Sequence, residues 1–318
     1  MNSTFKPAWW LPGSHLQTLW PALMRWKESL SLQYERLELS DGDFVDLAWV
    51  GRGSSPIVCI LHGLCGGMDS PYINGILGAI KRQGWRAVLM HFRGCSGEPN
   101  RLAKSYHSGE TGDLKFLLAE LKKREPNTPL FGIGYSLGGN VLLKCLGETG
   151  NTNPLKAAAA VSVPFELAKT AEHLKKGFSQ VYQKRLLSEL KIAHRAKFET
   201  MPAPIEFGDI DQLNNFFEFD NAITAPLHGF KDAMDYYQQC SSRQYLKNIE
   251  TPTLILHARN DPFTTTCSIP EQQDVSDKVN LEISEGGGHV GFVAGRYPWK
   301  PIYWLEKRIT QYFAQFLS

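Results

Sequence analysis

The sequence predicts an α/β protein with a mostly parallel eight-stranded sheet, helices on both faces of the sheet, and one helical insertion. Short aliphatic runs alternate with amphipathic stretches from about residue 30 to residue 162, which is typical of strands joined by crossover helices. The alternation stops after Pro164 and resumes near Thr253. The turn signal Ser40-Asp41-Gly42-Asp43 separates the first two runs, so we expect the sheet to begin antiparallel and then become parallel.

Each predicted element follows from its local pattern. β-branched and aliphatic runs bounded by Gly, Pro or Asp indicate strands, and apolar positions at helical spacing indicate helices. The expected strands are Gln33–Leu39, Phe44–Val50, Ile57–Leu61, Arg86–His91, Leu130–Gly134, Ala157–Val163, Thr253–His257 and Asn280–Ser284. The expected helices are Tyr72–Gln83, Gly112–Arg124, Leu137–Gly147, one beginning near Cys267, and Trp304–Phe316.

The insertion divides the chain into two expected units. Residues 1–163 and 240–318 form the α/β core, and residues 164–239 form a helical lid or cap. The inserted stretch has helices with charged faces and a loop rich in Asp, Asn and Phe near Asp209–Asp220. Because it follows a strand at the carboxyl edge of the sheet, we expect it to cover that edge. Seven phenylalanines in or beside it suggest an apolar pocket wall: Phe165, Phe178, Phe198, Phe207, Phe216, Phe217 and Phe219.

Composition excludes several classes of function. Hydrophobic residues make up 42% of the chain and charged residues 21%, as in globular proteins with a packed core. The 34 basic and 32 acidic residues form no long run of one sign, so we expect no nucleic-acid partner. The six cysteines contain no CxxC pair, which argues against a zinc site or a disulfide scaffold and favours buried, reduced thiols.

The first 24 residues are rich in Trp and Leu but are interrupted by Pro7, Pro12 and Pro21. They lack the unbroken apolar core of a signal peptide and the ~20 apolar residues of a membrane span. We therefore expect a cytoplasmic protein without a transmembrane segment, for which peripheral membrane contact stays open.

The strongest chemical signal is G-x-S-x-G at residues 134–138, between an apolar strand and a helix. A serine held on so tight a turn projects its hydroxyl above the sheet, and small residues on either side let strand and helix approach closely. We expect Ser136 to be a nucleophile.

A serine nucleophile needs a base and a group that orients the base. Of the histidines that follow Ser136, His289 lies in a Gly-rich loop directly after the last expected strand, where it can reach the carboxyl edge. Asp261 follows the strand before it and is the expected orienting acid, with Asp274 as the alternative.

Acyl transfer also requires two backbone N–H groups aimed at the developing oxyanion. Leu137, which follows the nucleophile, supplies one. The loop 62–67 after the third strand supplies the other, with Leu64 the preferred donor and Cys65 the next. This loop has neither the lysine nor the glycine spacing of nucleotide-binding loops, so we expect no cofactor.

Two further motifs have ordinary structural interpretations. His91-Phe92-Arg93-Gly94 ends a strand and turns the chain. Asp209 and Asp211 resemble a metal pair but have no third ligand at a recognisable spacing, so we expect them to cap or solvate helices and predict no metal.

Several motifs together resemble one family, the YheT-like esterases of the α/β-hydrolase superfamily. They are Pro7-Ala8-Trp9-Trp10, His15-Leu16-Gln17-Thr18, the loops 62–67 and 91–97, GYSLGGN at 134–140, ARNDPF at 258–263 and GGGHVGF at 286–292. The resemblance covers nearly the whole chain and is weakest in the insertion. It implies the same triad, Ser136, Asp261 and His289, and implies esters of medium-length acyl chains or phospholipids as substrates.

The expected function is hydrolysis of carboxylic esters of short to medium acyl length through an acyl-enzyme, with a small-molecule or lipid ester as substrate. Acyltransferase, thioesterase or phospholipase activity on the same triad is the alternative among enzymes. A catalytically silent binding protein on a hydrolase fold is the alternative from another class. The acyl length, the alcohol part and the oligomeric state are left open by the sequence.

Overall fold

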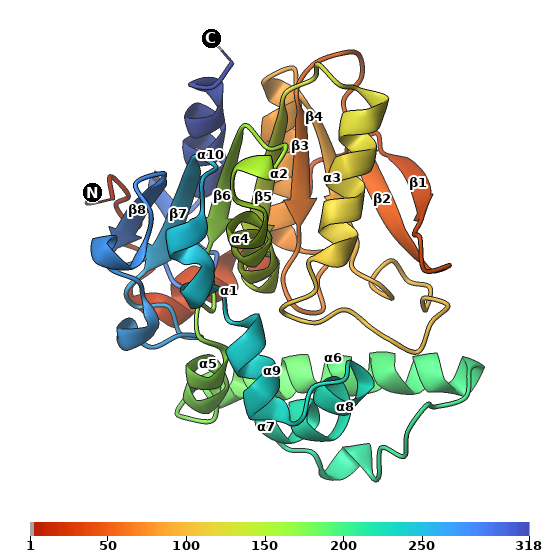
Figure 1. Cartoon of the computed structure of the whole chain (residues 1–318). Helices are drawn as coiled ribbons and strands as arrows, with labels where there is room; N and C mark the ends of the chain where they lie inside the picture. The colour runs from red at the N-terminus through yellow and green to blue at the C-terminus, as the bar shows by residue number, and fades with distance from the viewer. Residues whose placement is uncertain (1–2, 318) are drawn as a thin grey trace.

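The computed structural model describes residues 3–317 and contains the eight-stranded sheet that the sequence predicts (Figure 1). The strand order is β1-β2-β4-β3-β5-β6-β7-β8. β2 pairs antiparallel with both β1 and β4, and β3 to β8 run parallel, which confirms the expected change of direction. The strands are β1 (Gln33–Glu38), β2 (Phe44–Val50), β3 (Ile57–Leu61), β4 (Arg86–Met90), β5 (Leu130–Tyr135), β6 (Ala157–Val161), β7 (Thr253–Ala258) and β8 (Val279–Ser284).

Helices cover both faces of the sheet. α3 (Gly112–Arg124) and α4 (Leu137–Thr149) pack on one face, and α2 (Pro71–Arg82) and α10 (Trp304–Ala314) pack on the other. The central strands are buried along their whole length, as expected for parallel strands with helices on both sides. This apolar sandwich forms a rigid base for the loops at the carboxyl ends of the strands.

The helical segment, residues 164–239, lies between β6 and β7 and runs across the carboxyl ends of the strands (Figure 1). Its longest helix lies below the sheet in this view and is joined to α7 by residues 201–215, which contain the 3₁₀ turn Ile210–Gln212. The elements are α5 (Leu167–Leu174), α6 (Ser179–Thr200), α7 (Phe216–Phe219), a π-helical turn (Asp220–Thr224), α8 (Ala225–Leu227) and α9 (Ala233–Cys240).

Two regions differ from the sequence prediction. The helix expected near Cys267 is wrong: the chain there makes only the 3₁₀ turns Thr266–Ser268 and Gln272–Asp274. Pro270 lies between them and prevents a continuous helix, because proline disfavours helical backbone before it and lacks an N–H. The expectation of buried thiols is wrong for Cys267, which is exposed; all six cysteines are free.

The N-terminal region forms structure that the pattern did not indicate. α1 (Gly13–Met24) is a helix despite Pro21 in its last turns. It packs near a separate hairpin of β9 (Val293–Tyr297) and β10 (Lys300–Tyr303). Trp10 contacts Trp20 at 4.9 Å between ring centroids and donates its indole N–H to the Gly295 carbonyl, so long-range contacts stabilise this unit.

Candidate active site

Ser136 lies at the tight turn between β5 and α4. Its backbone has φ +51° and ψ −118°, a conformation that a side-chain-bearing residue rarely adopts. The strain is held by the hydrogen bond from the Ser136 N–H to the Val161 carbonyl on the neighbouring strand. Such a strained turn above a sheet edge presents the serine hydroxyl to the space over the strands.

The two glycines of the motif are required by close backbone approach. A Cβ on Gly134 would lie 2.4 Å from the Gly138 carbonyl oxygen, and a Cβ on Gly138 would lie 2.5 Å from the His62 carbonyl oxygen. Any larger residue would push α4 away from the sheet and move the serine.

The structure brings together the three residues that the sequence singled out. The Ser136 Oγ lies 3.0 Å from the His289 Nε2. The His289 Nδ1 lies 2.9 Å and 3.1 Å from the two carboxylate oxygens of Asp261, whose side chain is fully buried. Because a carboxylate only accepts, Nδ1 carries the proton and Nε2 faces the serine as an acceptor. Asp261 is itself fixed by the Phe263 N–H.

Further residues hold the His289 loop in place. The Phe263 ring stacks on the imidazole at 3.9 Å between centroids. The His289 N–H donates to the Thr18 hydroxyl, and the Gly288 N–H donates to the Asn260 side chain. Thr18 and Asn260 lie in motifs of the family resemblance, but periodicity and spacing alone gave no reason to assign them to the site.

The other candidates lie elsewhere. Asp274 pairs with Arg243 at 2.7 Å and caps the turn at Glu271, away from His289. His257 is buried within β7 against the Thr264 hydroxyl, and burial lowers the pKa of its imidazole to about 4. The alternative acid therefore does not contact the imidazole of His289.

The loop after β3 leaves one backbone donor free. Within residues 63–67, the Gly63 N–H donates to the Tyr72 hydroxyl and the Cys65 N–H donates to the Tyr106 hydroxyl. The N–H groups of Gly66 and Gly67 also have acceptors, so Leu64 has the only N–H of this stretch without an acceptor among the described residues. Leu137 begins α4, where the first N–H groups have no intrahelical acceptor.

The same loop is anchored by a buried histidine that does not face the nucleophile. His62 contacts the Gly63 carbonyl through Nδ1 and accepts the Phe92 N–H at Nε2. Burial lowers the pKa of His62 to about 3, so the ring stays neutral and keeps both contacts. It sets the path of the loop that presents Leu64.

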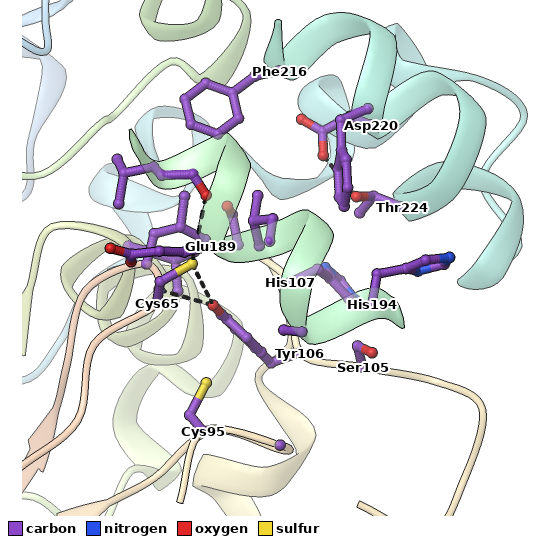
Figure 2. A pocket seen from close by; sticks show the side chains of 18 of the residues that line it. Cys65, Cys95, Ser105, Tyr106, His107, Glu189, His194, Phe216, Asp220 and Thr224 are labelled. Carbon is purple, nitrogen blue, oxygen red and sulfur yellow. Dashed lines mark hydrogen bonds between the residues drawn. The ribbon is translucent and has the colours of Figure 1, made fainter. Parts of the chain in front are cut away.

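A cavity of about 510 Å³ lies between the sheet edge and the helical segment (Figure 2). Ser136, Leu137, Leu64 and His289 line it from the core. The helical segment forms the opposite wall. Its aliphatic side chains there are Leu167, Ala171, Leu174, Leu186, Leu190 and Ile223, and its polar side chains are Asp220, His194 and Thr224. In Figure 2, Cys65 lies at the left of the view and Asp220 at the upper right.

The phenylalanines on which the expected apolar wall was based line the cavity only in part. Of the seven phenylalanines, Phe216 and Phe219 line the cavity. Phe165 is buried in the core beneath the segment, Phe198 and Phe207 pack with His194, and Phe178 is half-exposed. The wall is mainly aliphatic because most of these rings pack the segment internally or against the core.

A second cavity, of about 690 Å³, also reaches Ser136 and His289. Its walls come from α1, through Thr18, Ala22 and Arg25, and from the loop after β3. Ser136 thus lines two spaces, one under the helical segment and one beside α1.

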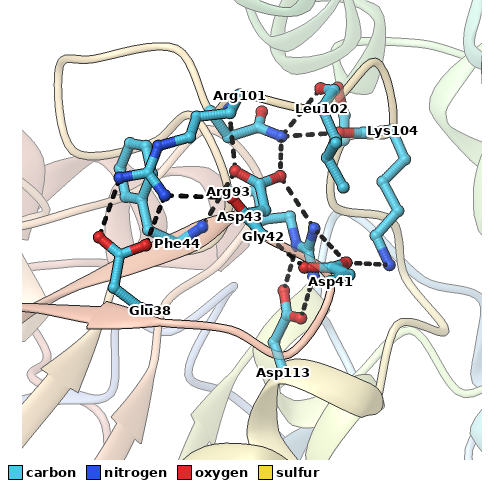
Figure 3. A network of polar contacts seen from close by, with 12 residues as sticks. Glu38, Asp41, Gly42, Asp43, Phe44, Arg93, Arg101, Leu102, Lys104 and Asp113 are labelled. Carbon is cyan, nitrogen blue, oxygen red and sulfur yellow. Dashed lines mark hydrogen bonds and ion pairs between the residues drawn. The ribbon is translucent and has the colours of Figure 1, made fainter.

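A buried ion-pair network fixes the loop that lines the first cavity (Figure 3). Arg93, which the sequence suggested as a simple turn residue, pairs with Asp43 at 2.9 Å and with Asp113 at 2.6 Å. Asn100 bonds to the same Asp43 and accepts from the Lys197 ammonium of α6. The network therefore connects the core to the helical segment.

Residues 3–317 contain no group of three or more His, Cys, Asp or Glu side chains placed to hold a metal ion. Asp209 accepts a hydrogen bond from the Asp211 N–H, which agrees with the expected capping role. No helix among these residues is long and apolar enough to cross a membrane.

Comparison with known proteins identifies the family of the chain. The family model of the α/β hydrolase fold matches residues 56–295, so the chain belongs to that family. Within the family it is YheT-like, since all of the chain aligns at 42% identity with 95% of the Escherichia coli protein named "Putative esterase YheT".

Two further matches extend the comparison. The chain is 29% identical to the mouse protein named "Phospholipase ABHD3" over 99% of this chain and 79% of that protein. The fold is also similar to that of the Pyrococcus furiosus esterase Pf2001, with a TM-score of 0.58, 16% identity, and coverage of 91% of this chain and 92% of that one.

Proposed function

We propose that the protein is a carboxylic ester hydrolase with Ser136 as nucleophile, His289 as general base and Asp261 as the residue that orients the histidine. The observation that carries the proposal is the continuous chain of hydrogen bonds from the Asp261 carboxylate through His289 to the Ser136 hydroxyl, at the floor of a largely apolar cavity. The esterase names of the relatives support the same reaction.

The geometry defines the steps. His289 Nε2 takes the proton as the Ser136 Oγ attacks the ester carbonyl, and then returns it to the leaving alcohol. Water, deprotonated by the same nitrogen, then attacks the acyl-enzyme and releases the acid. Asp261 stays ionised and stabilises the imidazolium that forms in each half-reaction.

The N–H groups of Leu64 and Leu137 are the proposed oxyanion hole. Both flank Ser136 in the cavity wall, and neither is used by the fold. Donors that are already oriented toward the developing oxyanion stabilise it without reorganisation. The Cys65 N–H, the other candidate, is occupied by the Tyr106 hydroxyl.

We assign residues 164–239 as a lid over the core formed by residues 1–163 and 240–318. Lid side chains such as Leu174, Leu190 and Ile223 face Ser136 across the cavity. Apolar walls of this kind favour an acyl chain. The proposed substrates are therefore esters of short to medium acyl chains.

Phospholipid hydrolysis on the same triad is the second candidate. It is favoured by the two cavities that meet at Ser136, since one can hold an acyl chain while the other holds a bulky alcohol part. The full-length relative named as a phospholipase supports the same class.

Labelling with a fluorophosphonate probe tests the catalytic assignment. We expect the wild-type protein to be labelled and to hydrolyse p-nitrophenyl butyrate, and Ser136→Ala to lose both. Labelling of Ser136→Ala at the wild-type rate would disprove the nucleophile. A folded wild-type protein that is neither labelled nor active would support the silent binding protein instead.

A further inference from the structure

Exposed apolar side chains are concentrated on one unit of the molecule. Eight of the fourteen large apolar residues that are exposed within residues 3–317 belong to the N-terminal segment and the β9–β10 hairpin. Three are tryptophans whose exposed fractions are 94% for Trp26, 80% for Trp299 and 76% for Trp9. The other five are Leu16, Leu23, Met24, Tyr297 and Ile302. Clusters of this kind mark interaction surfaces rather than ordinary surface composition.

The segments that carry these residues contact one another and form one unit of the molecule. The Trp9 indole N–H donates to the Arg296 carbonyl in β9, at 3.0 Å. At the far end of α1, the Arg25 guanidinium lies 3.9 Å from the centroid of the Tyr303 ring in β10. We call this surface, formed by residues 6–27 and 293–303, the tryptophan face.

The charge of the tryptophan face is of one sign. Residues 6–27 and 293–303 contain five basic residues and no Asp or Glu, although the whole chain has nearly equal numbers of each sign. Arg25 pairs with Glu306 and Lys27 with Asp69. The exposed side chains of Lys6, Arg296 and Lys300 have no acidic partner among the described residues.

We propose that the tryptophan face is a docking surface for anionic lipid bilayers. Exposed indoles prefer the boundary between headgroups and acyl chains, and basic side chains beside them are attracted to anionic headgroups. The indole N–H of Trp9 already has an acceptor within the protein. Burying this ring in a membrane therefore leaves no unpaired donor.

The position of α1 connects this surface to the active site. Leu16, Trp20 and Leu23 recur at helical spacing on one side of α1, and Leu16 and Leu23 are exposed. Thr18, Ala22 and Arg25 lie on the opposite side and line the second cavity, which contains Ser136. A bilayer on the outer side would lie about one helix diameter, ~10 Å, from the cavity.

The inference that the substrate is a lipid ester rests on the proposed ester hydrolase function. Binding to a bilayer does not itself require catalysis, so the two can be tested separately.

Vesicle sedimentation with full-length protein tests the surface. We use vesicles of phosphatidylcholine alone and vesicles of equal parts phosphatidylcholine and phosphatidylglycerol. Wild-type protein and Ser136→Ala should both bind the anionic vesicles, and binding should weaken in 0.5 M salt because salt screens charges. Activity on soluble p-nitrophenyl butyrate is the independent measure of the proposed function.

Two double variants and one control locate the contact. Trp26→Ser with Trp299→Ser should reduce the partition coefficient at least about tenfold, since two apolar rings are lost from the bilayer. Lys6→Glu with Lys300→Glu should abolish the preference for anionic vesicles. Tyr34→Ser with Met234→Ser removes two exposed apolar side chains elsewhere and should bind as wild type. All should keep wild-type activity on the soluble ester.

Three results would overturn the proposal. The first is wild-type protein that remains in the supernatant with both vesicles, and the second is a tryptophan variant that binds as tightly as the control. The third is a dimer in analytical ultracentrifugation that the tryptophan variant dissociates, which would make this face a contact between copies. Loss of soluble esterase activity in wild type with intact vesicle binding would contradict the proposed function and leave the docking surface standing.

Discussion

The core and the helical segment bury charge in different ways. In the core, the Arg93 guanidinium is almost fully buried but is paired with the carboxylates of Asp43 and Asp113. In the helical segment, the buried Lys197 ammonium donates only to neutral acceptors, on Asn100, Lys104 and Ser105. The Asp220 carboxylate likewise accepts only from the hydroxyls of Thr224 and Tyr237.

This difference shows where the molecule trades stability for another property. A buried charge without an opposite partner costs free energy, and burial lowers the pKa of Lys197 to about 8 and raises that of Asp220 to about 6. Both residues line the cavity opposite Ser136. Ionisable groups with perturbed pKa values on a cavity wall are candidates for a role in substrate fit or movement. The core should therefore carry the chemistry and the stability, and the helical segment the selectivity.

The largest expected effect is on the chemistry at the sheet edge. Asp261→Asn should lower kcat on the order of 10⁴-fold while the protein stays folded, because the amide favours the wrong imidazole tautomer. Steady-state kinetics with p-nitrophenyl butyrate and a circular dichroism spectrum measure the two properties. Asp274→Asn is the matched control, since its carboxylate pairs with Arg243 and does not contact His289. A drop in kcat of tenfold or less for Asp261→Asn would contradict the role of Asp261 in orienting His289.

The second prediction concerns the paired charges of the core. Arg93→Met should lower the free energy of unfolding by about 3–5 kcal/mol, because it leaves Asp43 and Asp113 buried without a cation. Urea denaturation measures the loss. The control Arg101→Met breaks an exposed pair with Glu38 and should cost less than about 1 kcal/mol. If the two variants lost equal stability, the core would not depend on the buried pairing.

The third prediction concerns the unpaired carboxylate of the helical segment. Because the pKa of Asp220 is higher in the folded protein, the folded state holds its proton more tightly than the unfolded chain. The resulting stabilisation is complete below about pH 4 and is lost as the pH rises through about 6. Wild-type protein should thus lose roughly 1–3 kcal/mol of stability between these values relative to Asp220→Asn. Urea denaturation of both proteins at pH 4.5 and 7.5 measures this difference, and parallel pH dependences would contradict it.

The core and the positions of the candidate triad could be predicted because local patterns determine them. Apolar runs bounded by turn residues predicted all eight strands, and G-x-S-x-G between β5 and α4 indicated Ser136 as the candidate nucleophile. Asp261 and His289 each follow a parallel strand. Because the carboxyl ends of parallel strands meet at one edge of the sheet, both side chains are predicted to lie at that edge. The structure brings these residues within hydrogen-bond distance.

What could not be predicted depends on contacts between distant segments. α1 contains Pro21, which disfavours a helix, and is stabilised by contacts with a hairpin some 280 residues later, such as Gln17 to Val293. Tyr106 occupies the Cys65 N–H, and no local pattern around Tyr106 indicates that contact. In the helical segment the number of phenylalanines suggested that these rings line the pocket, but composition does not determine which side of a helix faces the cavity.

The smallest expected effect is the gain in activity for each methylene added to the acyl chain. Each methylene held by the cavity wall should add up to ~0.8 kcal/mol of binding, or roughly fourfold in kcat/KM. A series of p-nitrophenyl esters from acetate to octanoate should therefore rise over the first few carbons and level off where the cavity ends. Leu190→Trp places a larger side chain in the wall and should move that limit to shorter chains. Met234→Trp, exposed on α9 and outside both cavities, should leave it unchanged. A flat series for the wild type, or the same limit in Leu190→Trp, would mean that the helical segment does not select the acyl chain.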